Sequence, residues 1–204
     1  MRINKKKYIY LISPNKIQKS FYSDLTEVLK SKKVGFFQLR LKNVSFKKKL
    51  FIGKKIKKIC KKYKTNFLIN DDVLLSKKLN TDGCHLGQKD MKLLEARSVI
   101  KSKIIGITCH NSIRLAKLAI KNKADYLAFG AFYISKTKKT KFKASLNLLK
   151  KIRKITKTPI VAIGGINSKN YKKLLLNKAN FLAISGYIWN NKKLKPLEAI
   201  KKLK

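Results

Sequence analysis

Short runs of β-branched and aromatic residues alternate with longer, lysine-rich segments of helical periodicity along the whole chain, and this alternation most constrains the fold. The runs predict strands at residues 8–12, 35–40, 66–70, 83–86, 104–108, 126–130, 159–163 and 181–185. The other segments predict helices at residues 20–32, 46–63, 72–79, 91–101, 112–122, 145–156, 168–176 and 196–203. We therefore expect an α/β protein in which each strand is followed by a helix.

The uninterrupted series of strand–helix units favours a closed parallel barrel, the (β/α)8 or TIM barrel, over an open sheet. The strands read as continuous apolar runs, which is typical of parallel strands that are buried on both faces. The 204 residues allow about 25 residues for each unit, near the lower limit for this fold. We expect a single TIM-barrel domain over residues 1–204.

The formal net charge of +43 raises the hypothesis of a nucleic-acid-binding protein. Nearly all of this charge is lysine spread over every segment, whereas arginine would be expected where bidentate recognition drives binding. The arginines are only Arg2, Arg40, Arg97, Arg114 and Arg153. The distribution favours lysines on solvated helix faces, so we expect no specific nucleic-acid partner.

Cysteine usage and hydropathy bear on the compartment. Cys60, Cys84 and Cys109 are odd in number and form no CxxC pair, which argues against a disulfide framework or a zinc site and favours small core residues. The sequence has no run of about 18 apolar residues and no signal-peptide pattern at its start. We expect a cytoplasmic protein without a membrane partner.

Polar side chains gather where the second predicted strand ends. Strand periodicity places Gln38, Arg40 and Lys42 on one face, and active-site groups of a TIM barrel lie at such strand ends. Two cations there suit a phosphate or pyrophosphate. The alternative is an exposed charged edge in a lysine-rich chain, but the scarcity of arginine favours a functional Arg40.

Acidic residues are concentrated after the third and fourth predicted strands. Asp71 and Asp90 would form, with a ligand phosphate, a hard oxygen site for Mg²⁺. Asp72 can instead be a helix N-cap and Asp82 a turn residue. We therefore assign the metal role to Asp71 and Asp90.

Later strand ends add hydroxyls, ammonium groups and glycines. Thr108 can bind substrate, whereas His85 and His110 are read as structural, His110 as a cap of the next helix. The segment 135–139 alternates hydroxyl and ammonium groups that could close over a pyrophosphate. Gly165, before a helix, and Ser185, on the next strand, indicate a second phosphate site, because barrels often bind phosphate after strands seven and eight. The alternative for the glycines is a tight turn.

In their order along the chain, these segments resemble the thiamine-phosphate synthase family over about residues 8–189. The matching stretches are Gln38-Leu39-Arg40 with Lys42, Ile69-Asn70-Asp71, Asp82-Gly83-Cys84-His85-Leu86-Gly87-Gln88 with Asp90, Ile105-Gly106-Ile107-Thr108, Ala124-Asp125-Tyr126, Ser135 to Lys138, and Ala162-Ile163-Gly164-Gly165-Ile166. The ordered set is far more specific than any one motif. That family joins an aminopyrimidine-methyl pyrophosphate to a thiazole phosphate with Mg²⁺ assistance.

The resemblance implies a role for each matching residue. Asp71 and Asp90 would bind Mg²⁺, and Gln38 would lie near the pyrimidine and the metal. The catalytic groups would be Arg40, Lys42 and Lys138, which with Asn70 hold the pyrophosphate, and Thr108 in the pyrimidine pocket. Ser135 and Thr137 would line a mobile loop, and Gly165 and Ser185 would mark the thiazole-phosphate site. By analogy with the family we expect a homodimer.

The chain departs from the family pattern at several positions. Ala131 and Ile134 replace loop prolines, Lys136 stands in a variable loop position, and Asn180-Phe181 replaces Asp-Gly before the last strand. These changes leave a divergent or inactive relative as an alternative. A thiazole tautomerase on the same barrel would need a histidine base where this chain has Ala131. A nucleic-acid-binding protein is the alternative from a different class.

Overall fold

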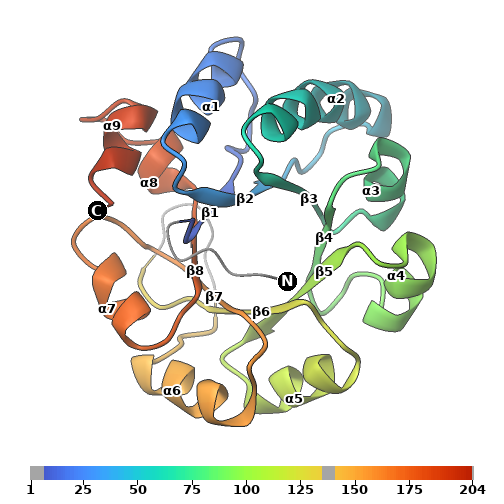
Figure 1. Cartoon of the computed structure of the whole chain (residues 1–204), viewed down its shortest axis with the longest axis vertical. Helices are drawn as coiled ribbons and strands as arrows, with labels where there is room; N and C mark the ends of the chain where they lie inside the picture. The colour runs from blue at the N-terminus through green and yellow to red at the C-terminus, as the bar shows by residue number, and fades with distance from the viewer. Residues whose placement is uncertain (1–6, 135–140, 204) are drawn as a thin grey trace.

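Eight parallel strands close into a barrel in the order of the sequence (Figure 1), in a computed structural model that describes residues 7–134 and 141–203. The strands are β1 (Ile9–Ile12), β2 (Val34–Leu39), β3 (Asn66–Asn70), β4 (Gly83–Leu86), β5 (Ile104–His110), β6 (Tyr126–Gly130), β7 (Ile160–Ile163) and β8 (Phe181–Ile184). Each strand pairs in parallel with the next, and β8 pairs with β1. The predicted TIM barrel is confirmed.

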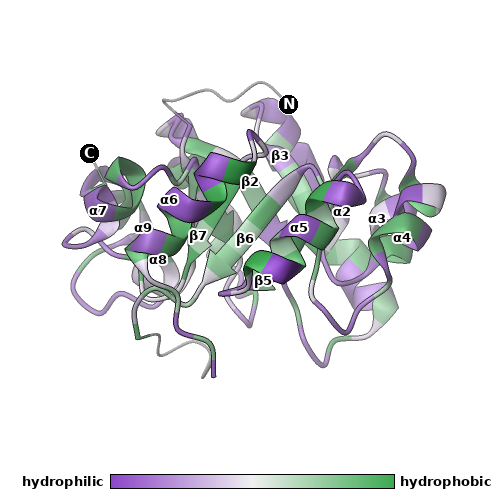
Figure 2. Cartoon of the chain, turned by 90° about the horizontal axis from the view of Figure 1, so that it is seen from below, coloured by the Kyte–Doolittle hydropathy of each residue, from purple (hydrophilic) through white to green (hydrophobic). Residues whose placement is uncertain are grey.

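Helices form the outer ring around these strands (Figure 1). They are α1 (Phe21–Lys30), α2 (Phe46–Lys62), α3 (Val73–Leu79), α4 (Leu93–Ile100), α5 (Ile113–Lys121), α6 (Leu146–Ile155), α7 (Tyr171–Leu176), α8 (Gly186–Trp189) and α9 (Pro196–Lys201). No helix within residues 7–134 and 141–203 is long and apolar enough to cross a membrane. The Lys-rich faces of the helices alternate with apolar ones, which Figure 2 shows as purple and green stretches along the ring.

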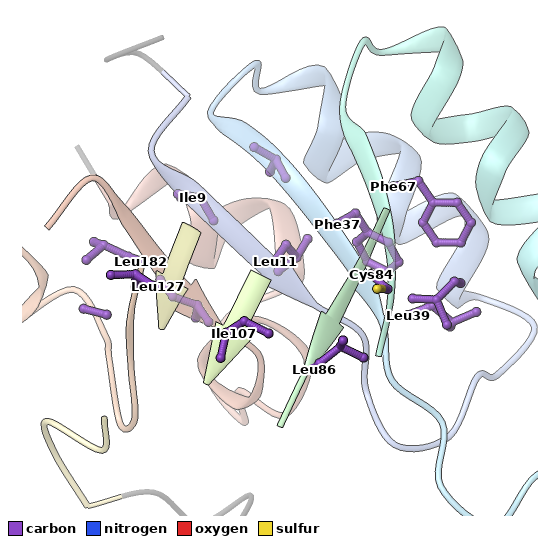
Figure 3. Close-up of a cluster of buried hydrophobic side chains, with 14 of the residues drawn as sticks. Ile9, Leu11, Phe37, Leu39, Phe67, Cys84, Leu86, Ile107, Leu127 and Leu182 are labelled. Carbon is purple, nitrogen blue, oxygen red and sulfur yellow. The ribbon is translucent and has the colours of Figure 1, made fainter. Parts of the chain in front are cut away.

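Strand side chains divide into two cores because successive residues point to opposite faces of the sheet. The larger core lies between strands and helices and contains Leu11, Phe37 and Phe67, which are fully buried (Figure 3). The smaller core contains Tyr10, Phe36, Leu68, Tyr126, Val161 and Phe181. Since these residues alternate with the members of the larger core along each strand, they lie inside the barrel. All three cysteines are buried and unpaired in the larger core, as predicted.

Many element boundaries differ from the sequence-based expectation by one to three residues, and helix α8 was not expected. Strand β5 continues to His110, and α7 begins at Tyr171 although the periodicity predicts a start at residue 168. The difference at α7 comes from asparagine side chains: Asn170 Oδ1 accepts from the backbone N–H of Asn167 at 2.9 Å, and Asn167 Oδ1 accepts from that of Lys169 at 2.8 Å. Such local hydrogen bonds compete with helix formation.

At the end of the barrel where the strands begin, one side-chain oxygen accepts hydrogen bonds both from a strand backbone N–H and from an arginine. This contact, which we call the clasp, recurs. Asp125 Oδ2 accepts from the backbone N–H of Ile105 at 2.8 Å and pairs with Arg97 at 2.7 Å. Asn180 does the same work with an amide oxygen, which accepts from the backbone N–H of Ile160 at 2.8 Å and from Arg153 at 2.5 Å. The departure from the family pattern at residue 180 therefore keeps the clasp.

The two ends of the described chain meet at this same end of the barrel. The Tyr8 hydroxyl donates to the backbone oxygen of Leu203 at 2.9 Å, and Lys33 Nζ donates to that oxygen at 2.6 Å. Leu203 itself is fully buried. The last helix is thereby fixed against the start of β1, opposite the strand ends that carry the candidate site.

Candidate active site at the mouth of the barrel

The carboxyl ends of β1 and β2 are fixed by a buried serine. The Ser13 hydroxyl accepts from the backbone N–H of Arg40 at 2.9 Å, and the Ser13 N–H donates to the Gln38 backbone oxygen at 2.9 Å. Since β2 ends at Leu39, Arg40 and Lys42 belong to the loop at the mouth. Gln38 is 2% exposed inside the barrel, Arg40 is partly buried and Lys42 is exposed.

Asp71 and Asp90 come from neighbouring strand ends and meet side chain to side chain. Asp71 follows β3 in the left-handed region, with φ of 65°, and its N–H donates to the His85 backbone oxygen of β4 at 2.8 Å. Asp90 Oδ2 accepts from the Gly87 N–H at 2.6 Å in the turn after β4. A non-glycine residue with positive φ is uncommon, and such residues cluster at functional sites.

The pKa of Asp71 reflects its burial and the charged groups that surround it. Burial, then a hydrogen bond and the negative charge from Asp90, raise the pKa of Asp71 to about 6, while the positive charges of Lys42 and Arg40 act in the opposite direction. The two carboxyls and the two cations therefore occupy one neighbourhood, as the sequence predicted. Perturbed carboxyl groups of this kind are candidates for a functional site.

These carboxylates fit a magnesium ion better than a metal held by protein alone. Within residues 7–134 and 141–203 no three or more His, Cys, Asp or Glu side chains gather around a possible ion. Mg²⁺ commonly takes one or two carboxylates and completes its shell with water and substrate phosphates. The pair Asp71 and Asp90 offers this donor set, and burial together with the neighbouring Asp90 carboxyl raises the pKa of Asp71.

The other acidic residues of this region have structural roles. Asp72 is the N-cap of α3 and accepts from the Leu75 N–H at 2.9 Å. Asp82 accepts from the Phe67 N–H at 2.7 Å at the start of β3. Both interpretations made from the sequence are confirmed.

Asn70 and Thr108 lie inside the barrel near the mouth, and both contact interior side chains. Asn70 Oδ1 accepts from Gln38 Nε2 at 2.5 Å, and Thr108 Oγ1 lies 2.8 Å from His85 Nε2. The Gln88 side chain donates to the Thr108 backbone oxygen. His85 thus lies among interior side chains, and its contacts tie a candidate substrate-binding residue to the core.

His110 has a different role from the predicted helix cap. Ser112 caps α5, accepting from the Leu115 N–H at 3.2 Å, whereas the His110 ring stacks on Phe142 with 4.0 Å between ring centroids. His110 therefore joins the end of β5 to the returning part of the loop between β6 and α6.

That loop carries the candidates Ser135, Thr137 and Lys138, which lie outside the described residues, as does Lys136. Its two described ends are held together: the Ala131 N–H donates to the Phe142 backbone oxygen at 3.0 Å, and the Ala144 N–H donates to the Ala131 backbone oxygen at 2.9 Å. The described residues on both sides of the segment 135–140 therefore lie beside the mouth.

Gly165 and Ser185 follow the paired strands β7 and β8, where Ile163 lies opposite Ala183. Gly165 has φ of +58°, and a Cβ there would lie 2.3 Å from the Ile134 backbone oxygen, so only glycine fits this close approach. Ser185 Oγ donates to the Ser13 backbone oxygen at 3.1 Å and precedes α8. The structure brings the two predicted residues to neighbouring strand ends.

Tyr10 and Tyr126 are interior polar residues that the sequence pattern did not single out. Both rings are buried inside the barrel, and their hydroxyls lie 2.8 Å apart. In the sequence they read as ordinary apolar members of strands. The only available signal was strand periodicity, which puts Tyr10 on the same inward face as Ile12, and Tyr126 on the same inward face as Ala128.

A closed parallel barrel with a polar, charged site at its strand ends defines a TIM-barrel enzyme. The sequence model of thiamine monophosphate synthase matches residues 9–188. The thiamine-phosphate synthase of Pelagibacter ubique is 71% identical over 207 residues, covering 100% of both chains, and that of Erythrobacter litoralis is 37% identical, covering 89% of this chain and 88% of its own. The solved thiamine phosphate pyrophosphorylase of Pyrococcus furiosus superposes with a TM-score of 0.86 at 27% identity, covering 98% of this chain and 94% of its own.

The chain belongs to the thiamine monophosphate synthase family and is a transferase of thiamine biosynthesis. This confirms the resemblance that the ordered motifs indicated. The roles of the individual site residues and of Mg²⁺ stay predictions.

Proposed function

We propose that this protein joins 4-amino-2-methyl-5-pyrimidinylmethyl diphosphate to a thiazole phosphate and releases pyrophosphate, the thiamine-phosphate synthase reaction. Family membership and the full-length relative at 71% identity support this activity. The observation that carries the proposal is the meeting of Asp71 and Asp90 within the electrostatic reach of Arg40 and Lys42. A diphosphate bound with a divalent cation needs this combination of charges.

Asp71 and Asp90 would hold the Mg²⁺. When bound, the ion supplies positive charge that neutralises the diphosphate as it leaves. Arg40 and Lys42 add two cations on the same side, and Asn70 lies at the adjoining strand end with its amide nitrogen without a hydrogen-bond partner among residues 7–134 and 141–203. We assign Lys138, Ser135 and Thr137 to the same diphosphate, from the loop whose ends lie at the mouth.

The remaining residues would bind the organic parts of the substrates. Thr108, inside the mouth, would contact the pyrimidine, and Gln38 would lie beneath it. Gly165 and Ser185, on the neighbouring ends of β7 and β8, would bind the thiazole phosphate. On this assignment the two phosphorylated ligands would lie on opposite parts of one strand-end surface. All these groups can position the reactants without forming a covalent bond to them.

In the proposed reaction, the bond between the methylene carbon and the diphosphate oxygen breaks, and the electron pair leaves with the pyrophosphate. The thiazole nitrogen then donates its electron pair to the pyrimidinylmethyl cation, so that charge and atoms balance. Arg40 and Lys42 stabilise the charge that develops on the leaving group. Catalysis then depends on electrostatics and positioning, and no protein nucleophile is required.

Release of pyrophosphate in the presence of both substrates tests this function. Asp71→Ala and Arg40→Ala should each lower kcat/KM by about 100-fold or more, the scale of loss when a preorganised charge partner is removed. Glu95→Ala and Arg114→Ala remove matched charges from exposed positions of α4 and α5 and should leave turnover unchanged. A metal-loaded protein that binds thiazole phosphate but releases no pyrophosphate would contradict the proposal and favour an inactive relative.

Metal removal tests the Mg²⁺ assignment separately. Chelation should abolish pyrophosphate release, and added Mg²⁺ should restore it. Turnover that persists after complete chelation would contradict the metal role of Asp71 and Asp90. The tautomerase alternative finds no support at Ala131, because a methyl side chain cannot act as a base, and the described backbone groups of Ala131 bond to Phe142 and Ala144.

A further inference from the structure

Hydrogen bonds form an unbroken chain across the interior of the barrel, from Asn70 on β3 to Thr108 on β5. Its first part runs through β2 and β1 to β6. Gln38 Nε2 donates to Asn70 Oδ1 at 2.5 Å, the Tyr10 hydroxyl donates to Gln38 Oε1 at 2.7 Å, and the hydroxyls of Tyr10 and Tyr126 lie 2.8 Å apart. All three of these linking side chains are buried.

The second part of the chain passes through a histidine. The Tyr126 hydroxyl lies 2.9 Å from His85 Nδ1, and His85 Nε2 lies 2.8 Å from Thr108 Oγ1. The rings of His85 and Tyr126 stack, with an interplanar angle of 9°. Six of the eight strands thus contribute one side chain each, and the two end members lie near the mouth.

The chain has a single polarity because each hydroxyl carries only one proton. Tyr10 donates its proton to Gln38, so its oxygen must accept from Tyr126. The proton of Tyr126 is then committed to Tyr10, so its oxygen accepts from His85 Nδ1–H. A neutral His85 with its proton on Nδ1 has a bare Nε2, which accepts from the Thr108 hydroxyl.

The protonation state of His85 agrees with this polarity. Burial lowers the pKa of His85 to about 4, although the negative charge of Asp90 acts in the opposite direction. The ring is therefore neutral near pH 7 and has one donor and one acceptor. A doubly protonated ring would need two acceptors and would reverse the role of Thr108.

Local packing is shaped to admit the central tyrosine. Gly106 of β5 faces the Tyr126 ring, and a Cβ at residue 106 would lie 1.8 Å from Tyr126 Cζ. No other residue type fits there without moving the ring. Phe36 packs against the same pair of tyrosines, with centroids 5.4 Å from Tyr10 and 5.9 Å from Tyr126, so apolar contacts hold both hydroxyls in place.

We propose that Tyr10, Tyr126 and His85 are positioning residues which fix, through this one-way chain, the hydrogen-bonding faces that Asn70 and Thr108 present to the substrates. Asn70 turns its oxygen to Gln38 and offers its amide N–H groups to the ligand. Thr108 donates its hydroxyl proton to His85 and presents only oxygen lone pairs to the ligand. The site then takes an oxygen anion at Asn70 and an N–H or O–H donor at Thr108. The link to catalysis rests on the proposed synthase function, whereas the chain itself does not.

The tautomer of His85 reports the polarity directly. The protein has two histidines, so ¹⁵N-histidine labelling gives two ring systems, and His110→Asn removes the second one for assignment. Nitrogen chemical shifts should show the proton of His85 on Nδ1 and a bare Nε2 at neutral pH. A proton on Nε2 in the unmodified protein would overturn the proposal, because the chain would then run from Asn70 to Thr108 with both amides reversed.

Tyr126→Phe breaks the chain at its centre. His85 Nδ1–H loses its acceptor, so the proton should move to Nε2 and donate to Thr108, whose own proton then faces the ligand. We expect kcat/KM for pyrophosphate release to fall by about tenfold or more, equivalent to about 1.4 kcal/mol of transition-state stabilisation. Tyr10→Phe should give a similar loss, because Gln38 loses its donor.

Tyr8→Phe is the matched control, since it removes a tyrosine hydroxyl bond of 2.9 Å that lies outside the interior chain. It should lower thermal stability through the loss of this hydrogen bond, but leave the His85 tautomer and kcat/KM unchanged. A Tyr126→Phe protein that is folded and keeps both the wild-type tautomer and kcat/KM would overturn the proposal. Absence of turnover in the wild type would contradict the synthase function alone, and the tautomer measurement would still decide whether the chain has this polarity.

Discussion

Asp71 is placed where its negative charge costs stability until a cation arrives. Because burial and Asp90 raise its pKa to about 6, against about 4 in an unfolded chain, the folded protein holds a proton that the unfolded chain releases between these values. The stability that this proton provides is fully present below pH 4 and is lost as the pH rises through 6. The metal-free protein is therefore less stable at neutral pH than it would be with an ordinary pKa at Asp71.

Asp71→Asn should stabilise the metal-free protein at pH 7.5 while lowering turnover by about 100-fold or more. Partial exposure of the site reduces the expected gain to about 1 kcal/mol, or about 2–4 °C in Tm for a domain of this size. Thermal melts with chelator at pH 4 and pH 7.5 measure it. The gain should vanish at pH 4, and a variant that is less stable than wild type at pH 7.5 would contradict this account.

Asn180 shows how a change from the family pattern can preserve a contact. Asn180→Ala leaves the Ile160 N–H and Arg153 without their shared acceptor, which should cost about 1–3 kcal/mol in the free energy of unfolding. Asn180→Asp restores an acceptor and a partner for the guanidinium, so its urea midpoint should equal or exceed that of wild type. Equal stability of all three proteins would show that the clasp carries little energy.

Much of the site could be predicted from single residues at strand ends. Asp71, Asp90, Arg40 and Lys42 meet as their positions after β2, β3 and β4 implied, because parallel strands bring their carboxyl ends to one edge. The internal use of Gln38 could not be predicted, since its partners Tyr10 and Asn70 are 28 and 32 residues away. Its substrate-binding role, like those of Lys138, Ser135 and Thr137, stays a prediction.

At the scale of elements, the indole of Trp189 connects α8 to β1 and α1. Trp189 Nε1 donates to the Ile12 backbone oxygen of β1 at 2.7 Å, and the ring lies 5.1 Å from the Phe21 ring of α1, centroid to centroid. The short helix follows Ser185 and Gly186 directly. Contacts of Trp189 therefore hold the segment that we assign to the thiazole phosphate.

Trp189→Phe keeps an aromatic ring but removes the hydrogen bond. We expect a loss of about 1 kcal/mol in stability and a several-fold higher KM for the thiazole phosphate, with the KM of the pyrimidine substrate unchanged. Tyr187→Phe, a change on the same helix, is the control. Equal changes in both KM values would mean that the variant acts through the whole barrel rather than through α8.

Strands were easier to predict than helix boundaries. Each strand is a buried apolar run between turn residues, so all eight appear at the expected places. Helix α8 was missed because the four residues Gly186–Trp189 are too few to show a helical period, and their stability comes from a tertiary contact. The start of α7 was wrong because asparagine side chains bond to the backbone there.

At the scale of the whole molecule, the net charge of +43 should attract phosphorylated substrates from solution. We expect kcat/KM to fall by about tenfold between about 20 and 300 mM NaCl, because salt screens this attraction, while kcat changes little. Assays of pyrophosphate release, run with both substrates at each ionic strength, measure kcat and kcat/KM. A salt-independent kcat/KM would show that the lysines serve only to solvate the helix faces.

The same charge tests the alternative of a nucleic-acid-binding protein. For a synthase we expect only weak, nonspecific binding of DNA or RNA at physiological salt, which electrophoretic or fluorescence titration can follow. Tight binding that survives Asp71→Ala would favour the alternative. The predicted homodimer belongs to the same scale and can be checked by sedimentation.

The contact between Tyr8 and Leu203 has a topological consequence. The two described ends touch on the side of the barrel away from the reacting groups. The fold therefore does not require that β1 come first in the sequence. A circularly permuted gene that links these ends and opens the chain at another connection on that side should encode the same cylinder. The order in which the strands leave the ribosome would then be exchangeable, while the ring that they complete stays the same.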